Sequence, residues 1–228
     1  MSDSSVLTPQ WPGLSGPLVS RLLEFNLLPS RTLHPGQADQ LAPPEGMADA
    51  SEAVRNVLHR HWSRRLLNRL GANAASVIEL DEPTLPLALA APPQLMRLAR
   101  DLGIALIGPS LRRIIEREQV LKARSELGEH GMVWALEGAP ALMSGLEDAH
   151  SWLQAGWAQA ADRLGCGMLA QAWHDAPAPI RERANWKLHP DSLNVETRTA
   201  SGHTAPQARS VCLQRLNQID PTWLLSFH

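Results

Sequence analysis

The amino-acid sequence predicts a mainly α-helical protein that forms one compact domain with short strands or none. The 228 residues include 36 Leu and 30 Ala, but only 9 Val, 7 Ile, 2 Phe and no Tyr. Leu and Ala cost least in a helix, whereas the depleted residue types are those that favour strands. Apolar residues also recur every three or four positions in successive segments, which is the spacing of one helix face.

The N-terminal part predicts an irregular lead followed by two helices. Residues 1–16 hold several Pro and Gly residues and are expected to be irregular. Residues 18–28 carry a helical apolar face that Pro29 ends. The clearest helix covers 52–70, and Gly71 follows it where a left-handed C-terminal residue is common.

Proline and glycine divide the central part of the chain. A Pro-rich stretch contains the one candidate strand, Val77–Leu80. A helix is expected from Leu95 to Leu106, and Gly108-Pro109 should break it. Ser110 then caps a second helix.

The C-terminal part predicts two more helices and a loop between them. A helix over 146–164 should end at Gly165, and the polar residues 189–207 are expected to form a long loop. A final helix opens at Pro206 and ends at Ile219. Periodicity assigns these residues to one continuous core: Val54, Leu58, Trp62, Leu98, Leu102, Ile114, Leu153 and Trp157.

The charge balance and the cysteines favour a soluble intracellular protein. The formal net charge is -2, which disfavours a generic nucleic-acid binder because such proteins must neutralise phosphates. Cys166 and Cys212 form no CxxC motif and are expected to be reduced core thiols. The N-terminus lacks the pattern of a secretory signal, and no window approaches the roughly 18 apolar residues of a membrane span. We therefore expect a cytoplasmic protein without direct membrane insertion.

The chain lacks the sequence patterns of common catalytic, cofactor and metal sites. It contains no Gly-x-Ser-x-Gly, no Gly-x-x-x-x-Gly-Lys and no strand-linked Gly-x-Gly-x-x-Gly. His59 and His61 are the closest histidines, but residues two apart on a helix point in different directions and cannot share a metal ion. Cys166 stands between two glycines with no nucleophile signature around it, so a small buried residue explains it better. We expect no catalytic residue, no cofactor and no metal.

Clustered arginines are the strongest candidates for a binding surface. The candidate partner-binding arginines are Arg60, Arg64, Arg65 and Arg69 in the helix 52–70, and Arg112 and Arg113 further along the chain. Three interpretations are open: an ordinary solvated helix face, a face that docks an acidic partner, or a nucleic-acid surface. The negative net charge and the lack of interleaved aromatic residues disfavour the last.

Tryptophan supplies a second kind of interface candidate. Most of the eight tryptophans fall on apolar helix faces and are expected in the core. Trp11, Trp186 and Trp223 lie in or beside irregular segments. Because Trp is enriched at interface hot spots, these three are the better candidates for partner contacts, Trp223 above all.

Three short segments carry a family resemblance. Residues 25–35 read Phe-Asn-Leu-Leu-Pro-Ser-Arg-Thr-Leu-His-Pro, and residues 102–114 read Leu-Gly-Ile-Ala-Leu-Ile-Gly-Pro-Ser-Leu-Arg-Arg-Ile. Residues 218–227 run from Gln-Ile-Asp-Pro-Thr-Trp to a late Phe. In this order they resemble the F-x-x-x-P-x-x-x-L/V-H opening, the L-G-L-x-L-x-G-x-x-I-R-R stretch and the Pro-Thr tail of the YscK/SctK family of bacterial type III secretion proteins. The middle segment is the most specific of the three.

The resemblance implies a non-enzymatic cytoplasmic adaptor of the type III secretion sorting platform, with a predominantly helical fold. Members of that family link the cytoplasmic domain of the SctD-type inner-membrane ring protein to the SctQ-type pod protein. The family supplies no catalytic residue that could be carried over. Two other classes stay open: a small helical enzyme using His34, Arg112 and Arg113, and a nucleic-acid-binding regulator using the helix 52–70.

Overall fold

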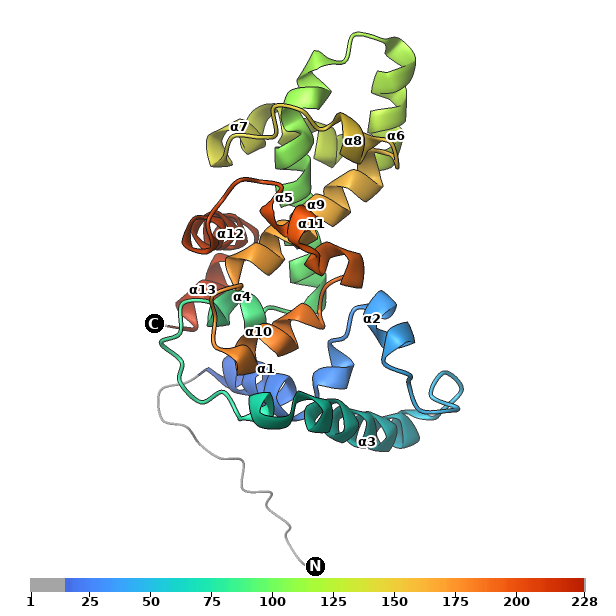
Figure 1. Cartoon of the computed structure of the whole chain (residues 1–228), viewed down its shortest axis with the longest axis vertical. Coiled ribbons are helices and arrows are strands. Elements are labelled where there is room, and N and C mark those ends of the chain that lie inside the picture. The colour runs from blue at the N-terminus through green and yellow to red at the C-terminus, as the bar shows by residue number, and fades with distance from the viewer. Residues whose placement is uncertain (1–14, 228) are drawn as a thin grey trace, which may run out of the picture.

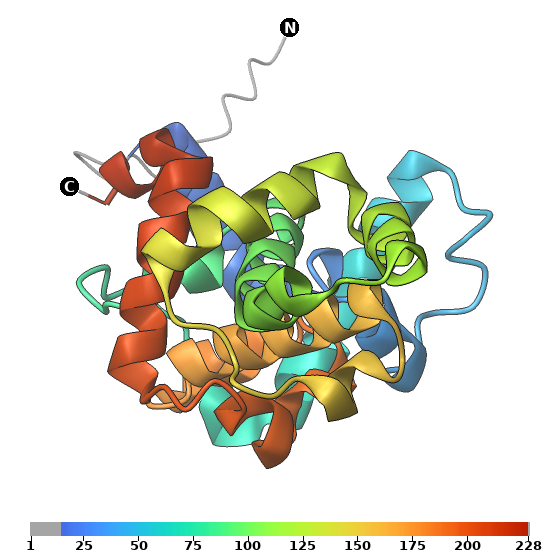
Figure 2. The ribbon, with the colours of Figure 1, turned by 90° about the horizontal axis from the view of Figure 1, so that it is seen from above.

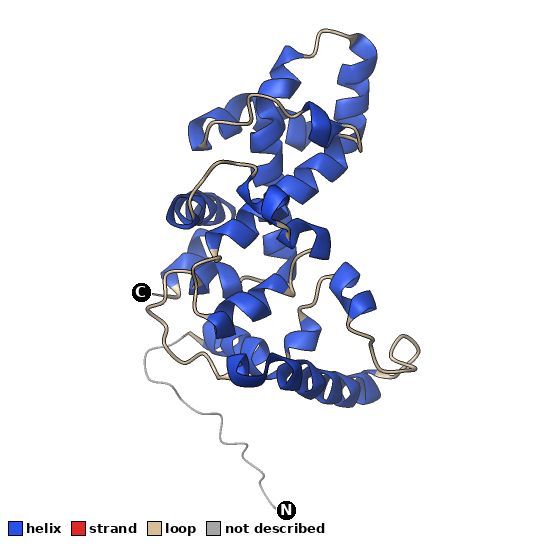
Figure 3. Ribbon diagram, viewed as in Figure 1, coloured by secondary structure: helices blue, strands red, loops and turns tan. Residues whose placement is uncertain are grey.

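The computed structural model describes residues 15–227, and every regular element within this range is helical (Figure 1) (Figure 3). The prediction of a mainly α-helical protein is confirmed. The molecule is elongated, with α3 at one end and α6, α7 and α8 at the other (Figure 1). The helices α5 and α9 pack side by side through the middle. Seen from above, α12 lies on one side of this pair, and the segment between α2 and α3 projects on the other (Figure 2).

The N-terminal segment agrees well with its prediction. It forms α1 (Gly16–Leu27), η1 (Pro29–Arg31), α2 (Pro35–Gln40), α3 (Glu52–Leu70) and η2 (Gly71–Ala74). Residues 1–14 of the expected irregular lead lie outside the described residues. At its end, Ser15 caps α1 by accepting a hydrogen bond from the N–H of Leu18, and Gly16 is already helical. Gly71 ends α3 with a φ of 54°, as its position predicts.

The strand predicted over 77–80 is wrong. The chain passes here without regular structure into α4 (Leu85–Leu89) and α5 (Pro92–Arg113). The Asn26 side chain takes the place of a partner strand: its Nδ2 donates to the carbonyl of Val77, and its Oδ1 accepts from the N–H of Val77, both at 2.8 Å. The apolar β-branched residues that suggested a strand therefore lie in an irregular segment. The Asn26 side chain satisfies the backbone N–H and C=O of Val77 in place of a neighbouring strand.

The break predicted at Gly108-Pro109 is also wrong, because α5 continues through both residues. Proline removes one helical N–H donor and crowds the preceding turn. A later segment packs against that turn, where the N–H of Leu146 donates to the carbonyl of Leu106 at 2.7 Å. Its Gly145 lies so close that a Cβ there would overlap the ring of Pro109. The helix therefore continues through a turn against which a later segment is closely packed.

The helix predicted over 146–164 differs from the structure at both ends. The chain forms α6 (Arg117–Val133), η3 (Trp134–Gly138), α7 (Ala139–Leu142), α8 (His150–Leu153) and α9 (Trp157–Ala172). Gly156, with a φ of 104°, separates α8 from α9. Gly165 does not end α9; it packs against the backbone of Ala99 in α5, where there is no room for a Cβ. This glycine serves close helix packing rather than termination.

The long loop predicted over 189–207 is wrong as well. The C-terminal part forms α10 (Ala178–Asn185), η4 (Pro190–Leu193), α11 (Val195–Thr199), α12 (Ala205–Ile219) and α13 (Pro221–Leu225). Asn194 caps α11 by accepting from the N–H of Thr197 at 2.8 Å. Thr197 is buried against Gly167 of α9. The polar residues that suggested a loop are therefore caps of short helices packed on the core. The final helix is confirmed as α12.

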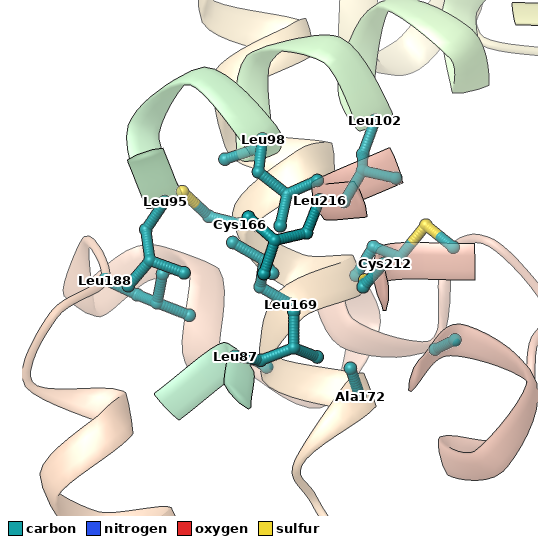
Figure 4. Packing of buried hydrophobic residues seen from close by; sticks show 14 of the residues in the cluster. Leu87, Leu95, Leu98, Leu102, Cys166, Leu169, Ala172, Leu188, Cys212 and Leu216 are labelled. Atoms are coloured by element: carbon teal, nitrogen blue, oxygen red, sulfur yellow. The ribbon is translucent and has the colours of Figure 1, made fainter. Parts of the chain in front are cut away.

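The main core lies where α5, α9 and α12 meet. Figure 4 shows Leu98 and Leu102 of α5, Cys166 and Leu169 of α9, and Leu216 of α12 packed together. All five side chains are buried. Both cysteines are free and buried, as expected for core thiols. Burial raises the pKa of the Cys166 thiol to about 11, so it is protonated at neutral pH.

The predicted core list is right for α5 and α9 but not for α3. Trp157 is buried like Leu98 and Leu102, and Ile114 and Leu153 pack against the cluster half-buried. Trp62 is buried but lies outside the main cluster, and Leu58 is only half-buried. Val54 is 51% exposed, so its assignment to the core is wrong. The cause is that α3 buries only a narrow face, formed by Trp62, Ser63 and Leu66.

Candidate docking surface

The exposed side of α3 carries an unpaired cationic surface. Its residues, here called the α3 arginine face, are Arg60, Arg64, Arg65 and Arg69. All four are exposed. The ion pairs within residues 15–227 involve other arginines, and none uses these four. Arg69 stands in the last turn, where positive charge is favoured by the helix dipole.

The opposite side of α3 is held firmly against the N-terminal segment. The Ser30 hydroxyl lies 2.7 Å from the Ser63 hydroxyl and 2.9 Å from Nδ1 of His59. The indole Nε1 of Trp62 donates to the carbonyl of Leu41 at 3.3 Å. Burial, together with the charges of nearby arginines, lowers the pKa of His59. These contacts fix the rotation of α3 about its axis and thereby direct the arginine face toward solvent.

Apolar side chains accompany the arginines on this exposed side. Val54 and Val57 are 51% and 58% exposed. Val57, Arg60 and Arg64 lie three and four residues apart, so they neighbour one another on the helix surface. The surface therefore offers both guanidinium groups and exposed hydrocarbon. A surface with both kinds of group suits a protein partner better than a surface that could make only electrostatic contacts.

Arg112 and Arg113 do not join this surface. They end α5 at the far end of the molecule from α3 (Figure 1). Arg112 donates to the carbonyl of Ala135 at 3.1 Å, and Arg113 donates to the carbonyl of Glu147 at 3.0 Å. Both guanidinium groups thus stabilise the chain's own turns. Both side chains are nevertheless exposed, so their role as partner contacts stays a prediction.

The tryptophans proposed for an interface have different positions. Trp223 is 7% exposed, donates from Nε1 to the carbonyl of Pro86 at 2.8 Å, and packs edge-on against Phe227. It belongs to the core, and its assignment to a partner interface is wrong. The C-terminal segment that carries Trp223 folds back as α13 onto α4 and α12. Trp186 is half-buried, and Trp11 lies outside the described residues.

The residues considered for an enzyme do not form one site. His34 lines a cavity of about 410 Å³ together with Cys166 and His189, whereas Arg112 and Arg113 are not part of its wall. Within residues 15–227 no group of three or more His, Cys, Asp or Glu side chains is placed to hold a metal ion. A contact that the sequence motifs do not predict joins His34 to His189. Its signal was present in the chain as two His-Pro dipeptides, at 34–35 and 189–190.

None of the helices in the described part of the chain is long and apolar enough to cross a membrane. Comparison with protein-family models, with curated proteins and with solved structures finds no match to this chain.

Proposed function

We propose that this protein is a non-enzymatic adaptor whose α3 arginine face docks an acidic protein surface. The role proposed is that of a cytoplasmic component of a type III secretion sorting platform, peripheral to the inner membrane through its partners. Those partners are the cytoplasmic domain of an SctD-type ring protein and an SctQ-type pod protein. The observation that carries the docking surface is the set of four exposed arginines without ion pairs among the described residues. The choice of partners rests on the order of the three motifs.

The physical argument begins with the segregation of charge. The chain as a whole has a net charge of -2, yet the C-terminal half of α3 exposes Arg60, Arg64, Arg65 and Arg69, and Glu52 is the one acidic residue of the helix. A local positive field of this kind accelerates the encounter with an acidic surface and is screened over about 8–10 Å at physiological salt. Arginine adds planar, bidentate hydrogen bonds to carboxylates.

The geometry supports a surface kept free for a partner. Other arginines of the protein are used internally: Arg100 pairs with Asp162 at 2.7 Å, and Arg215 pairs with Asp101 at 2.6 Å. The α3 arginines have no comparable role in the described fold. A helix of 19 residues is about 28 Å long, which is enough to form one side of an interface of standard size.

The test is a double charge reversal, Arg64→Glu with Arg65→Glu. Binding of the full-length protein to the purified ring-protein domain and to the purified pod protein, both from the same genome, is measured at low and at physiological salt. We expect at least about a tenfold weaker affinity for one of the two partners, most clearly at low salt. Circular dichroism and thermal unfolding should not change, since both side chains are exposed.

The matched control is Arg97→Glu with Arg117→Glu, two exposed arginines on other helices that change the net charge by the same amount. Unchanged binding of both partners by the folded Arg64/Arg65 variant would mean that the exposed side of α3 is an ordinary solvated helix face. Equal losses in the two variants would mean that net charge, and not this surface, governs binding. Duplex DNA binding that falls steeply with salt and is lost in the Arg64/Arg65 variant would instead favour the nucleic-acid-binding class.

A further inference from the structure

Two histidines cap two different helices in the same way. His34 precedes α2, and its Nδ1 accepts a hydrogen bond from the N–H of Gly36 at 3.1 Å. His189 precedes η4, and its Nδ1 accepts from the N–H of Asp191 at 3.2 Å. Each histidine is followed by the proline that opens the helix. Both caps require an Nδ1 that carries no proton, because a protonated nitrogen has no lone pair to accept with.

The two caps meet at one contact. The rings of His34 and His189 lie edge to face, with centroids 5.3 Å apart. Gly36 packs on the His189 ring so closely that a Cβ would come within 3.2 Å of its Nε2. The backbone N–H of His34 also donates to the carbonyl of Trp186 at 2.9 Å. Segments more than 150 residues apart in sequence, α2 and η4, are joined at this point.

We propose that His34 and His189 form a pH-sensitive latch, which holds α2 against η4 while both rings are neutral and releases it when both are protonated. Protonation at Nδ1 removes each cap, and it places two positive charges on adjacent rings. Neutral caps and ring contact therefore favour the closed arrangement, whereas the doubly charged state favours separation.

The charged groups around the latch favour an asymmetric response. Asp191 lies 3.7 Å from Nδ1 of His189 and can hold that ring when it is protonated. From α9, Asp162 and Arg163 line the same cavity, but Asp162 is already paired with Arg100 of α5. His34 has no carboxylate within ion-pair distance among residues 15–227. Burial, and then the charge of His189, lowers the pKa of His34 below its ordinary 6.5. Release is therefore set by His34 and occurs on the acidic side of that value.

The experiment is amide hydrogen exchange of the whole protein at about pH 7.5 and about pH 5.5, expressed as protection factors so that the chemical pH dependence of exchange cancels. We expect protection of α2 to fall at least about tenfold at the lower pH, while α9 keeps its protection. The variant His34→Asn with His189→Asn retains capping side chains but cannot titrate. Its α2 protection should be the same at both pH values, whether high or low.

A thiol probe separates local release from global unfolding. Cys166 lies in the wall of the cavity beside the latch, whereas Cys212 is fully buried in the main core (Figure 4). Labelling rates with 4,4′-dithiodipyridine are divided by the rate for free cysteine at the same pH, because acidification lowers the thiolate fraction of every thiol. On this scale, acidification should accelerate labelling of Cys166 in a Cys212→Ala variant. Labelling of Cys212 in a Cys166→Ala variant should not change. Equal α2 protection at both pH values in the wild type would overturn the latch. So would a pH response that persists in the double Asn variant, or equal acceleration of both thiols.

Discussion

Gly103 of α5 lies directly against the backbone of Ala161 of α9, so that a Cβ on Gly103 would overlap the carbonyl oxygen of Ala161. The contact is reciprocal, since Gly165 of α9 meets the backbone of Ala99 of α5 in the same way. Residues four apart share a helix face, so each helix contributes an Ala-x-x-x-Gly stripe to the crossing. This close approach sets the distance between the two helices that carry most of the core. It also gives a packing reason for the Gly103 of the Leu-Gly-Ile segment.

Gly103→Ala is therefore expected to destabilise the protein strongly, even though Ala is the better helix former. The added methyl meets backbone atoms, which cannot move away without separating α5 from α9. We expect a loss of at least about 3 kcal/mol in the free energy of unfolding, measured by urea denaturation. The control is Gly16→Ala in α1, where a Cβ has nothing within 4 Å and should change stability by less than about 1 kcal/mol. Similar stabilities of the two variants would contradict the packing argument.

The same crossing shows where sequence reasoning succeeds and where it fails. The boundaries of α3 and α12 follow from local features, namely apolar spacing, a glycine after one helix and a proline at the start of the other. The end predicted at Gly165 and the break predicted at Pro109 are wrong because both residues pack against a segment that is distant in sequence. Gly165 lies within α9 because the crossing with α5 leaves no room for a Cβ, and Pro109 lies within α5 where a later segment packs against the helix.

The candidate surface was predictable only in part. Arginine spacing identified the α3 face correctly as exposed, because the helix pattern is local. The sequence could not distinguish these arginines from Arg112 and Arg113, whose partners are carbonyl groups brought near by folding. Trp223 was misassigned for the same reason, since the segment that covers it lies more than 130 residues away.

A buried ion pair between Asp101 and Arg215 ties α12 to α5. Nε and Nη2 of Arg215 both donate to Oδ2 of Asp101, at 3.0 and 2.6 Å, and the guanidinium lies 3.6 Å from the centroid of the Trp134 ring. Arg215→Met leaves a buried carboxylate unpaired and should cost about 3–5 kcal/mol.

A double-mutant cycle by chemical denaturation tests this pair. Adding Asp101→Asn to Arg215→Met should recover about 1–3 kcal/mol relative to the sum of the single changes. The control is Arg124→Met, which breaks the exposed pair with Glu129 and should cost less than about 1 kcal/mol. Additive effects at Asp101 and Arg215 would show that the pair is not coupled.

Asn26 is expected to matter for stability because its amide satisfies both backbone groups of Val77. Asn26→Ala leaves a buried N–H and a buried C=O without partners, and should cost at least about 2 kcal/mol. Asn56→Ala is the matched change, since that side chain only accepts from the exposed guanidinium of Arg31. It should alter the free energy of unfolding by no more than about 0.5 kcal/mol. Equal effects in thermal or urea unfolding would refute the role assigned to Asn26.

Lys187 should make stability depend on pH in a range where few other groups titrate. Its Nζ is buried, donates to the carbonyls of Ala88 and Ala90 at 2.6 and 3.2 Å, and lies 5.3 Å from the centroid of the Phe25 ring. Burial lowers its pKa from 10.5 to about 7. In the unfolded chain Lys187 stays protonated up to its ordinary pKa, so above pH 7 the unfolded state binds more protons than the folded state. The free energy of unfolding must therefore rise with pH in this window.

The expected rise is about 1 kcal/mol between about pH 7 and pH 8. This window lies below the range near pH 9 in which the two buried thiols lower stability, because thiols ionise there in the unfolded chain but not in the folded one. Lys187→Met, which keeps an apolar stem and removes the titrating group, should flatten this part of the curve. The chain's other lysine provides the control: Lys122 has a 64% exposed side chain, and Lys122→Met should leave the rise intact. Urea denaturation across the pH series measures all three proteins. A flat profile in the wild type would mean that the two carbonyls and the Phe25 ring hold the ammonium charged within the core, and an unchanged rise in Lys187→Met would assign the titration to another group.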